Sequence, residues 1–162
     1  MPITIPASPV ALVPNTGRGT TLSFIIGGTG TTPAPGTYIF VNLISIDGPN
    51  ITVGEVDATV LSSVFKPYIP TLPEGECTFT CQFITGDPAL KAVRQMLAAA
   101  PMVPTVSWVV TYPLERGQLT AATDTFPGFI KGFPVTGNEN ETIPTVAIPI
   151  RLTGPVVSVD AV

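Results

Sequence analysis

Residues 76–84 read Glu-Cys-Thr-Phe-Thr-Cys-Gln-Phe-Ile, a run in which polar and apolar side chains alternate. Successive side chains of a β-strand point to opposite faces, so this alternation predicts a strand with one buried face. Cys77, Phe79, Cys81 and Phe83 share that face. In a strand the two cysteines lie about 13 Å apart, at about 3.3 Å per residue, whereas a disulfide tolerates no more than about 7 Å. The sequence therefore predicts two free, buried thiols.

Other short segments alternate in the same way or are rich in β-branched and aromatic residues, as strands are. The sequence predicts further strands at residues 20–26, 38–46, 51–60, 105–112, 123–133, 144–153 and 156–159. Residues 47–50, Asp-Gly-Pro-Asn, have the composition of a turn. Residues 61–75 hold three prolines and no regular pattern. We expect a long irregular loop there, of a length that is usually functional.

One helix is expected, at about residues 87–100. Asp87 is a preferred N-cap and Pro88 suits the first helical position. Leu90, Val93 and Leu97 recur at helical spacing and form its expected buried stripe.

Short strands with a single helix predict a mainly β fold, namely a β-sandwich or barrel-like domain with the helix packed against it. We expect this single domain to span residues 20–162. Residues 1–19 contain four prolines and no sustained periodicity, so they are expected to form an extended arm.

The composition favours self-assembly. Of the 162 residues, 44% are hydrophobic and only 11% are charged, against about 25% charged in typical domains. The mean hydropathy is +0.46. A surface with so few charges is expected to be buried in contacts, and further copies of the same chain can provide these contacts.

The composition also argues against several function classes. A net charge of −4 argues against tight phosphate binding. The chain has no histidine, which removes Ser-His-Asp and Cys-His catalysis and His-ligated zinc. We expect no membrane segment, because no run of 18 apolar residues occurs. The first residues have no basic group ahead of an apolar stretch and are not expected to be a signal peptide.

Three motifs have both a functional and a plain structural interpretation. Residues 63–66 match the Ser-x-x-Lys nucleophile pattern, but Pro67 follows at once and the partner motifs are missing. Residues 27–32 are glycine-rich without the Gly-Lys-Thr ending of a phosphate loop. Residues 138–141, Asn-Glu-Asn-Glu, lack calcium-loop spacing and read as a hairpin tip. We therefore expect no catalytic residue, cofactor or metal, and a protein that is not an enzyme.

The ordered segments of the chain resemble those of a known family. They are Gly17–Phe24 (GRGTTLSF), Val41–Ser63, Phe65–Phe83, Asp87–Ala99 and the closing stretches WVVTYP, FPGFIKGFPV and VAIPIRLTGPV. This set resembles the tail tube (major tail) proteins of long-tailed, lambda-like bacteriophages over about residues 17–157.

The resemblance implies a structural virion protein of the phage tail. Its copies would form hexameric rings that stack into a hollow tube, which conducts DNA through its lumen without specific binding. The implied partners are further copies of the chain, the tape-measure protein and the tail terminator and tip proteins.

Two sets of residues are candidates for this role. The loop side chains expected to contact a neighbouring subunit or ring are Leu61, Val64, Phe65, Tyr68, Ile69 and Leu72. Glu55 and Asp57 are the candidate lumen-facing acids, because like-charge repulsion would keep DNA from adhering. The alternative function is a sandwich-type adhesion or decoration domain of a virion or cell surface, which an exposed aromatic or charged binding patch would favour.

Overall fold

The computed structural model describes residues 19–27, 33–60, 68–115, 117–137 and 142–162. In chain order, the elements are β1 (Thr21–Ile26), β2 (Gly36–Ile39), β3 (Leu43–Asp57), β4 (Tyr68–Gln82), α1 (Pro88–Ala98), β5 (Val106–Thr111), β6 (Thr123–Ile130), β7 (Val135–Thr136), β8 (Thr145–Leu152) and β9 (Val157–Val159). The expectation of a mainly β chain with one helix is confirmed.

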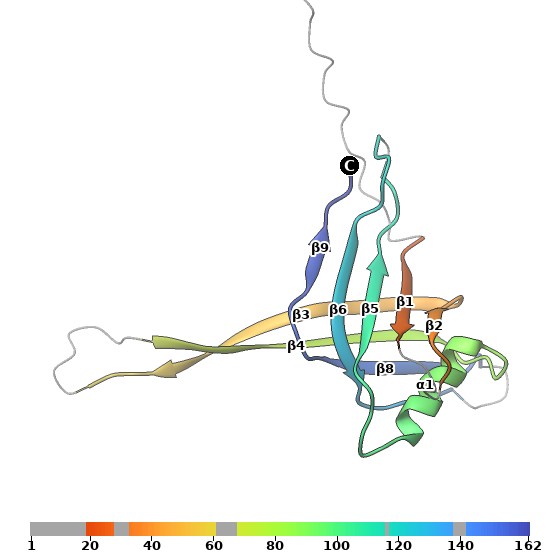
Figure 1. Cartoon of the computed structure of the whole chain (residues 1–162), viewed down its shortest axis with the longest axis horizontal. Coiled ribbons are helices and arrows are strands. Elements are labelled where there is room, and N and C mark those ends of the chain that lie inside the picture. Colours follow the sequence, from red (N-terminus) through yellow and green to blue (C-terminus); the bar gives the residue numbers. More distant parts are fainter. Residues whose placement is uncertain (1–18, 28–32, 61–67, 116, 138–141) are drawn as a thin grey trace, which may run out of the picture.

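All strands within the described residues belong to one antiparallel sheet, in the order β2-β1-β5-β6-β8-β4-β3. β7 pairs with β8, and β9 pairs with β6. β6 joins the two halves of the sheet, β2-β1-β5 and β8-β4-β3, because it pairs with β5 and its end also pairs with β8. Its start pairs with β9 as well. In Figure 1, β3, β4 and β8 cross the view, whereas β1, β5, β6 and β9 stand upright, with β5 and β9 pointing up and β1 and β6 pointing down. The sandwich-like packing thus comes from one sheet that folds over on itself.

Aromatic side chains fill the space between the two halves. The ring of Phe79 on β4 lies 5.7 Å from Trp108 on β5, and Phe24 on β1 lies 5.0 Å from Trp108. Phe40 contacts Phe79 with ring centroids 4.7 Å apart. The Trp108 Nε1 donates to the backbone oxygen of Gly128 at 3.1 Å, which satisfies the one polar atom of the indole. Rings from both halves therefore form one continuous core.

The corner between β6 and β8 requires a glycine. A Cβ at Gly128 would lie 2.7 Å from Ile150 Cγ2 and 2.9 Å from the backbone oxygen of Arg151. Such distances are too short for a real side chain, so only glycine lets the two strands approach this closely.

Helix α1 begins as expected. The Asp87 carboxylate accepts a hydrogen bond from the Ala89 backbone N–H at 2.8 Å, and Pro88 occupies the first turn. Its buried side chains include Leu90, Val93 and Met96, and it contacts β2 and β6. The helix ends at Ala98, two residues earlier than expected.

Two of our expectations about the region between residues 43 and 82 are wrong. Residues 47–50 do not form a turn but lie inside β3, where the register shifts between Asp47 and Asn50. Gly48 has φ +109° and would place a Cβ 2.9 Å from the Glu76 backbone oxygen. Turn-forming residues here make a bulge, because the strand continues on both sides of them.

The expected irregular loop at residues 61–75 is wrong for its second half, because Tyr68–Gly75 belong to β4. Pro70 pairs with Glu55 and Pro73 pairs with Val53, on either side of a register shift. Prolines are tolerated at bulges and in strands with an open side, and at these residues β4 pairs only with β3. Residues 61–67 lie outside the described part of the chain.

Candidate functional site

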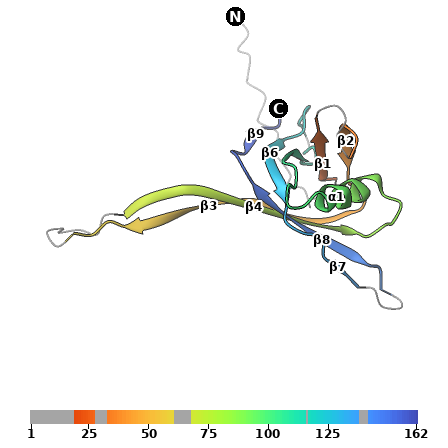
Figure 2. The same ribbon diagram turned by 60° about the horizontal axis from the view of Figure 1, so that its bottom comes forward.

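Strands β3 and β4 continue past the rest of the sheet as a two-stranded ribbon (Figures 1 and 2). β4 pairs with β8 only between Glu76 and Gln82, whereas its pairing with β3 continues to Asp57 and Tyr68. Beyond Glu76, no third strand lies beside the ribbon in the described part of the chain. A hairpin with no further strand and no helix against it is at best marginally stable in water.

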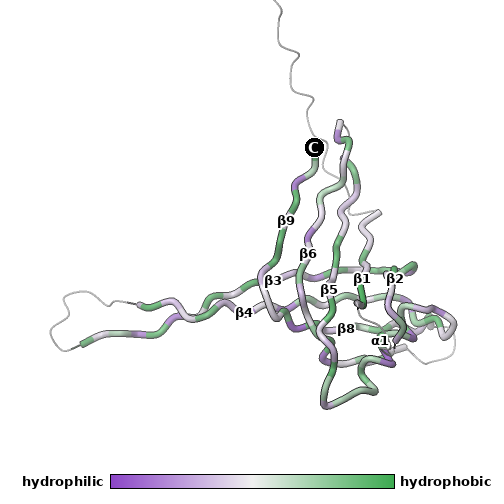
Figure 3. The backbone as a smooth tube through the Cα atoms, in the orientation of Figure 1, coloured by the Kyte–Doolittle hydropathy of each residue, from purple (hydrophilic) through white to green (hydrophobic). Residues whose placement is uncertain are grey.

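Large apolar side chains along this ribbon are exposed. Six of them are more than half exposed, and Leu72 is 86% exposed. These side chains, which we call the ribbon patch, are Ile51, Val53, Val56, Tyr68, Ile69 and Leu72. Figure 3 shows hydrophobic segments continuing along both strands far from the body. Exposed apolar surface of this kind marks an interaction site.

The ribbon patch includes three of the candidate contact residues. Tyr68, Ile69 and Leu72 lie on β4, on a paired strand rather than on the expected loop. Leu61, Val64 and Phe65 lie outside the described residues. The role of all six in contacting a neighbour stays a prediction.

An apolar hollow of about 510 Å³ lies where the ribbon meets the body. Its lining includes Ile51 and Leu72 from the ribbon, and Leu152, Pro155 and Val156 from β8 and the residues that follow it. The hollow extends the ribbon patch onto the body, so the exposed apolar surface continues past the ribbon itself.

The face of β3, β4 and β8 that points away from the core is polar. On β4, Cys77, Phe79 and Cys81 are buried, so the alternating residues from Glu74 to Gln82 lie on the opposite face. The registers place further side chains beside them on β3 and β8. This polar face consists of Ser45, Asp47, Asn50, Thr52, Glu74, Glu76, Thr78, Thr80, Gln82, Thr145, Ala147, Pro149 and Arg151.

Glu55 and Asp57 are exposed near the end of the ribbon. Alternation along β3 from Asn50 places them with Ile51 and Val53, on the side of the ribbon opposite to Glu74 and Glu76. The structure therefore does not bring these two acids onto the polar face. The hydroxyl and the backbone N–H of Thr59 donate to the Asp57 carboxylate, and these hydrogen bonds lower the pKa of Asp57.

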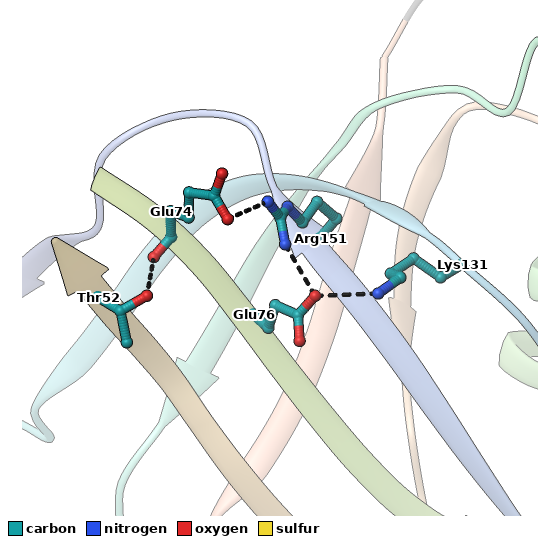
Figure 4. A network of polar contacts seen from close by, with 5 residues as sticks. All are labelled: Thr52, Glu74, Glu76, Lys131 and Arg151. Atoms are coloured by element: carbon teal, nitrogen blue, oxygen red, sulfur yellow. Dashed lines mark hydrogen bonds and ion pairs between the residues drawn. The ribbon is translucent and has the colours of Figure 1, made fainter. Parts of the chain in front are cut away.

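Four charged residues form a connected network at the base of the ribbon (Figure 4). Arg151 donates from Nη1 to Glu76 Oε1 at 2.9 Å and from Nη2 to Glu74 Oε2 at 2.7 Å. Lys131, which follows β6, donates from Nζ to the same Glu76 oxygen at 2.9 Å. Hydrogen bonds from Lys131 and Arg151 lower the pKa of Glu76, and those to Glu74 and Glu76 raise the pKa of Arg151.

Sequence reasoning did not find this network. The alternation of residues 144–153 puts Arg151 on the polar side of its strand, and Glu74 and Glu76 occupy alternating positions of β4. Nothing in the sequence shows that β4 and β8 are neighbours in the sheet, because they are far apart along the chain. The missing information was the strand order, not the side-chain pattern.

The prediction of two free, buried thiols is confirmed. Burial raises the pKa of Cys77 to about 12 and that of Cys81 to about 11. Thiols so buried are poor nucleophiles and belong to the core. The structure shows no group of acids, histidines or cysteines able to hold a metal ion, and no helix long and apolar enough to cross a membrane, in the residues it describes. Residues 63–66 and 138–141 lie outside those residues.

No protein-family model and no curated protein sequence matches this chain. Solved structures do match its fold. The SPP1 tail tube aligns with a TM-score of 0.66 at 12% identity, over 90% of this chain and 78% of that one. The tail of an empty GTA particle, refined with C6 symmetry, aligns with a TM-score of 0.60 at 12% identity, over 86% and 96% of the two chains.

A chain of the PVC sheath–tube complex, from an extracellular contractile injection system, aligns with a TM-score of 0.64 at 11% identity over 91% of both chains. Identities this low carry information about the fold alone. The chain therefore shares its fold with the SPP1 tail tube and with these components of the GTA tail and the PVC complex.

Proposed function

We propose that this chain is the structural subunit of a phage tail tube, in which its copies stack as rings into a hollow conduit for DNA. The observation that carries the proposal is the ribbon patch, a set of exposed apolar side chains on two strands that leave the body. The shared fold supports it, because one of the similar structures is a tail tube.

The ribbon patch supports polymerisation rather than a closed pair. The ribbon extends to one side of the body, and helix α1 lies at the other end (Figure 1). A surface at one end that docks on a different surface of the next copy makes a head-to-tail contact, which propagates into rings or filaments. Contacts made by the ribbon would bury Tyr68, Ile69 and Leu72 between successive copies, together with Leu61, Val64 and Phe65.

The open edge of the sheet supports closure within a ring. β3 is the last strand of the sheet and is 15 residues long. A long unpaired edge is a template for pairing with another chain, and closing sheets into a barrel removes such edges. Six copies per ring are proposed in keeping with the C6 symmetry of the similar GTA tail.

The polar face supports a water-filled lumen. Its neutral members are mainly hydroxyl and amide side chains, and its charged residues are Asp47, Glu74, Glu76 and Arg151, with Lys131 beside them. Such a face is wetted without offering clustered bases to phosphates. We place it on the channel wall, and keep Glu55 and Asp57 as further candidate lumen acids.

Membership of a tail tube implies a location, a role and partners for the chain. The chain would act in the virion, as part of the tail, and would have a structural rather than an enzymatic role. Its partners would be its own copies, the tape-measure protein and the terminator and tip proteins at the tube ends.

Light scattering and electron microscopy of the purified chain test the proposal. We expect rings or long tubes from the wild type and monomers from the variant I69S/L72S, whose positions are 57% and 86% exposed. The matched control M102S/L119S changes apolar side chains that are 83% and 88% exposed but lie off the ribbon, and should still form tubes. A wild-type chain that stays monomeric would favour an adhesion or decoration domain instead.

A further inference from the structure

Both basic groups at the polar face are already paired with carboxylates. Arg151 uses its two terminal nitrogens on two different acids, Nη1 on Glu76 and Nη2 on Glu74. Lys131 reaches Glu76 at 2.9 Å. The Arg151 side chain is 32% exposed and the Lys131 side chain 45% exposed, so solvent and ions reach both of them. The two bases are therefore kept from other anions by their ion pairs with carboxylates and not by burial.

An unpaired arginine in this position would bind DNA. The guanidinium presents paired N–H donors that match the oxygens of a phosphate, and each base that neutralises a phosphate adds salt-dependent affinity. In a tube, every copy would repeat the same two bases, and many weak contacts along one strand would act together. A conduit lined in this way would hold the molecule that it has to release.

The network also explains why bases occur on this face at all. Arg151 lies directly opposite Glu76 across β8 and β4, and Lys131 follows the last residue of β6. The contacts join three strands at the point where the ribbon leaves the body (Figure 4). Ion pairs that join these strands require bases, and the same bases need neighbouring acids if they are not to bind phosphate.

We propose that Glu74 and Glu76 mask Arg151 and Lys131 from phosphate, so that the polar face lets DNA pass without retaining it. This inference rests on the proposed function for its biological purpose. Glu76 is the central residue, because it contacts both bases while Glu74 contacts only Arg151.

The first test compares two variants with equal changes in charge. E76Q removes the acid that pairs with both bases. D47N removes an acid of the same face whose carboxylate accepts from Asn50 and makes no ion pair in the described residues. Assembled tubes are mixed with a short fluorescent DNA duplex and sedimented. We expect E76Q tubes to carry DNA into the pellet, and wild-type and D47N tubes to leave it in solution.

Salt dependence shows whether two phosphates are bound per copy. E76Q leaves Glu74 paired with Arg151 Nη2, so two free bases are expected only in E74Q/E76Q. With a slope of about −0.9 per phosphate, two contacts make the affinity of E74Q/E76Q tubes fall about tenfold between about 50 and about 200 mM salt. The triple variant E76Q/K131Q/R151Q should lose the binding again. Equal pelleting of DNA by D47N and E76Q, or none by E76Q, would overturn the inference.

A second test works on the unassembled chain and separates this inference from the proposed function. Pyrophosphate is titrated into the wild type and E76Q while the Arg151 side-chain N–H signals are followed by NMR. A saturable shift in E76Q alone supports masking, and no shift in either chain contradicts it. If the wild type forms no tubes, the proposed function fails, and the pyrophosphate titration still decides the inference.

Discussion

Arg151 and Glu76 face each other across strands β8 and β4, and the guanidinium donates to the carboxylate at 2.9 Å. The pair sits where the two-stranded ribbon leaves the three-stranded part of the sheet. Lys131 and Glu74 extend it to a network of four charges. Glu76 is therefore the residue through which the body and the base of the ribbon are electrostatically connected.

Acid should weaken this connection. The pKa of Glu76 lies below its ordinary value of 4.5, because Lys131 and Arg151 donate to the carboxylate. A lowered folded-state pKa gives stability that is present above the unfolded value and is lost as pH falls through the folded one. We expect the free energy of unfolding to fall below pH 4.5, and E76Q to lose part of this fall. Denaturant titrations at a series of pH values measure this loss of stability.

The control for this prediction is E55Q, which removes an acid outside the described ion pairs and should behave as the wild type does. Equal behaviour of E55Q and E76Q would contradict the role assigned to Glu76.

The corner between β6 and β8 should be intolerant of any side chain. The Cβ of Gly128→Ala would lie 2.7 Å from Ile150 Cγ2 and 2.9 Å from a backbone oxygen. We expect a loss of about 1–3 kcal/mol, the usual cost of overpacking a core. The control Gly86→Ala places its Cβ where no heavy atom lies within 4 Å. Urea denaturation compares the two, and a Gly128→Ala protein as stable as the control would show that the corner can relax.

Alternation along the chain identifies most of the strands, the helix and the free thiols, because these depend on side-chain periodicity and local caps. The strand expected at residues 38–46 is wrong, because β2 ends at Ile39 and β3 begins at Leu43. Sequence patterns give the wrong structure at residues 47–50 and 68–75. Asp-Gly-Pro-Asn suits a turn and a bulge equally well, and the outcome depends on whether a partner strand continues beyond it. Pro70 and Pro73 oppose a central strand, and only the tertiary arrangement, in which β4 has one neighbour there, makes them acceptable.

The candidate site could be predicted only in part, for the same reason. The apolar character of Tyr68, Ile69 and Leu72 is evident in the sequence, and their exposure matches the expectation of an interaction surface. The network around Glu76 depends on residues 55 and 75 positions apart along the chain. Strand order is a global property that no local pattern encodes.

The two thiols should be unreactive in the folded protein. Burial raises the pKa of Cys77 from 9.0 to about 12 and that of Cys81 to about 11. At a pH of about 8 the thiolate fraction is therefore lower by about a thousandfold and about a hundredfold, and alkylation slows accordingly. Mass spectrometry should find no label on the native chain and two labels after denaturation without reductant. Fast native labelling would show that the core opens, and a missing label after denaturation would indicate a disulfide.

Lumen charge can be located by comparing two pairs of substitutions. E55K/D57K reverses the two acids near the end of the ribbon, and D47K/E76K reverses two acids of the polar face. If the polar face lines the channel, D47K/E76K virions should release their genome more slowly, through attraction to phosphates. E55K/D57K virions should do so only if those acids also reach the lumen. Ejection kinetics measure both, with tube formation checked by electron microscopy. Normal ejection from D47K/E76K virions would place the polar face outside the channel.

The ribbon should be dispensable for folding and essential for assembly. Thr52 and Glu74 face each other across it, so replacing residues 53–73 with Asn-Gly joins them by a favoured two-residue turn. Among the residues that the structure describes, no buried core side chain lies in the removed segment, and the network of Glu74, Glu76, Arg151 and Lys131 remains. The shortened chain loses five of the six ribbon-patch residues and with them the surface for the next copy. We expect a circular dichroism spectrum and melting transition like those of the wild type, with monomers in place of tubes by light scattering and electron microscopy. Tubes from the shortened chain would show that other surfaces drive stacking, whereas an unfolded chain would mean that the ribbon stabilises the body itself.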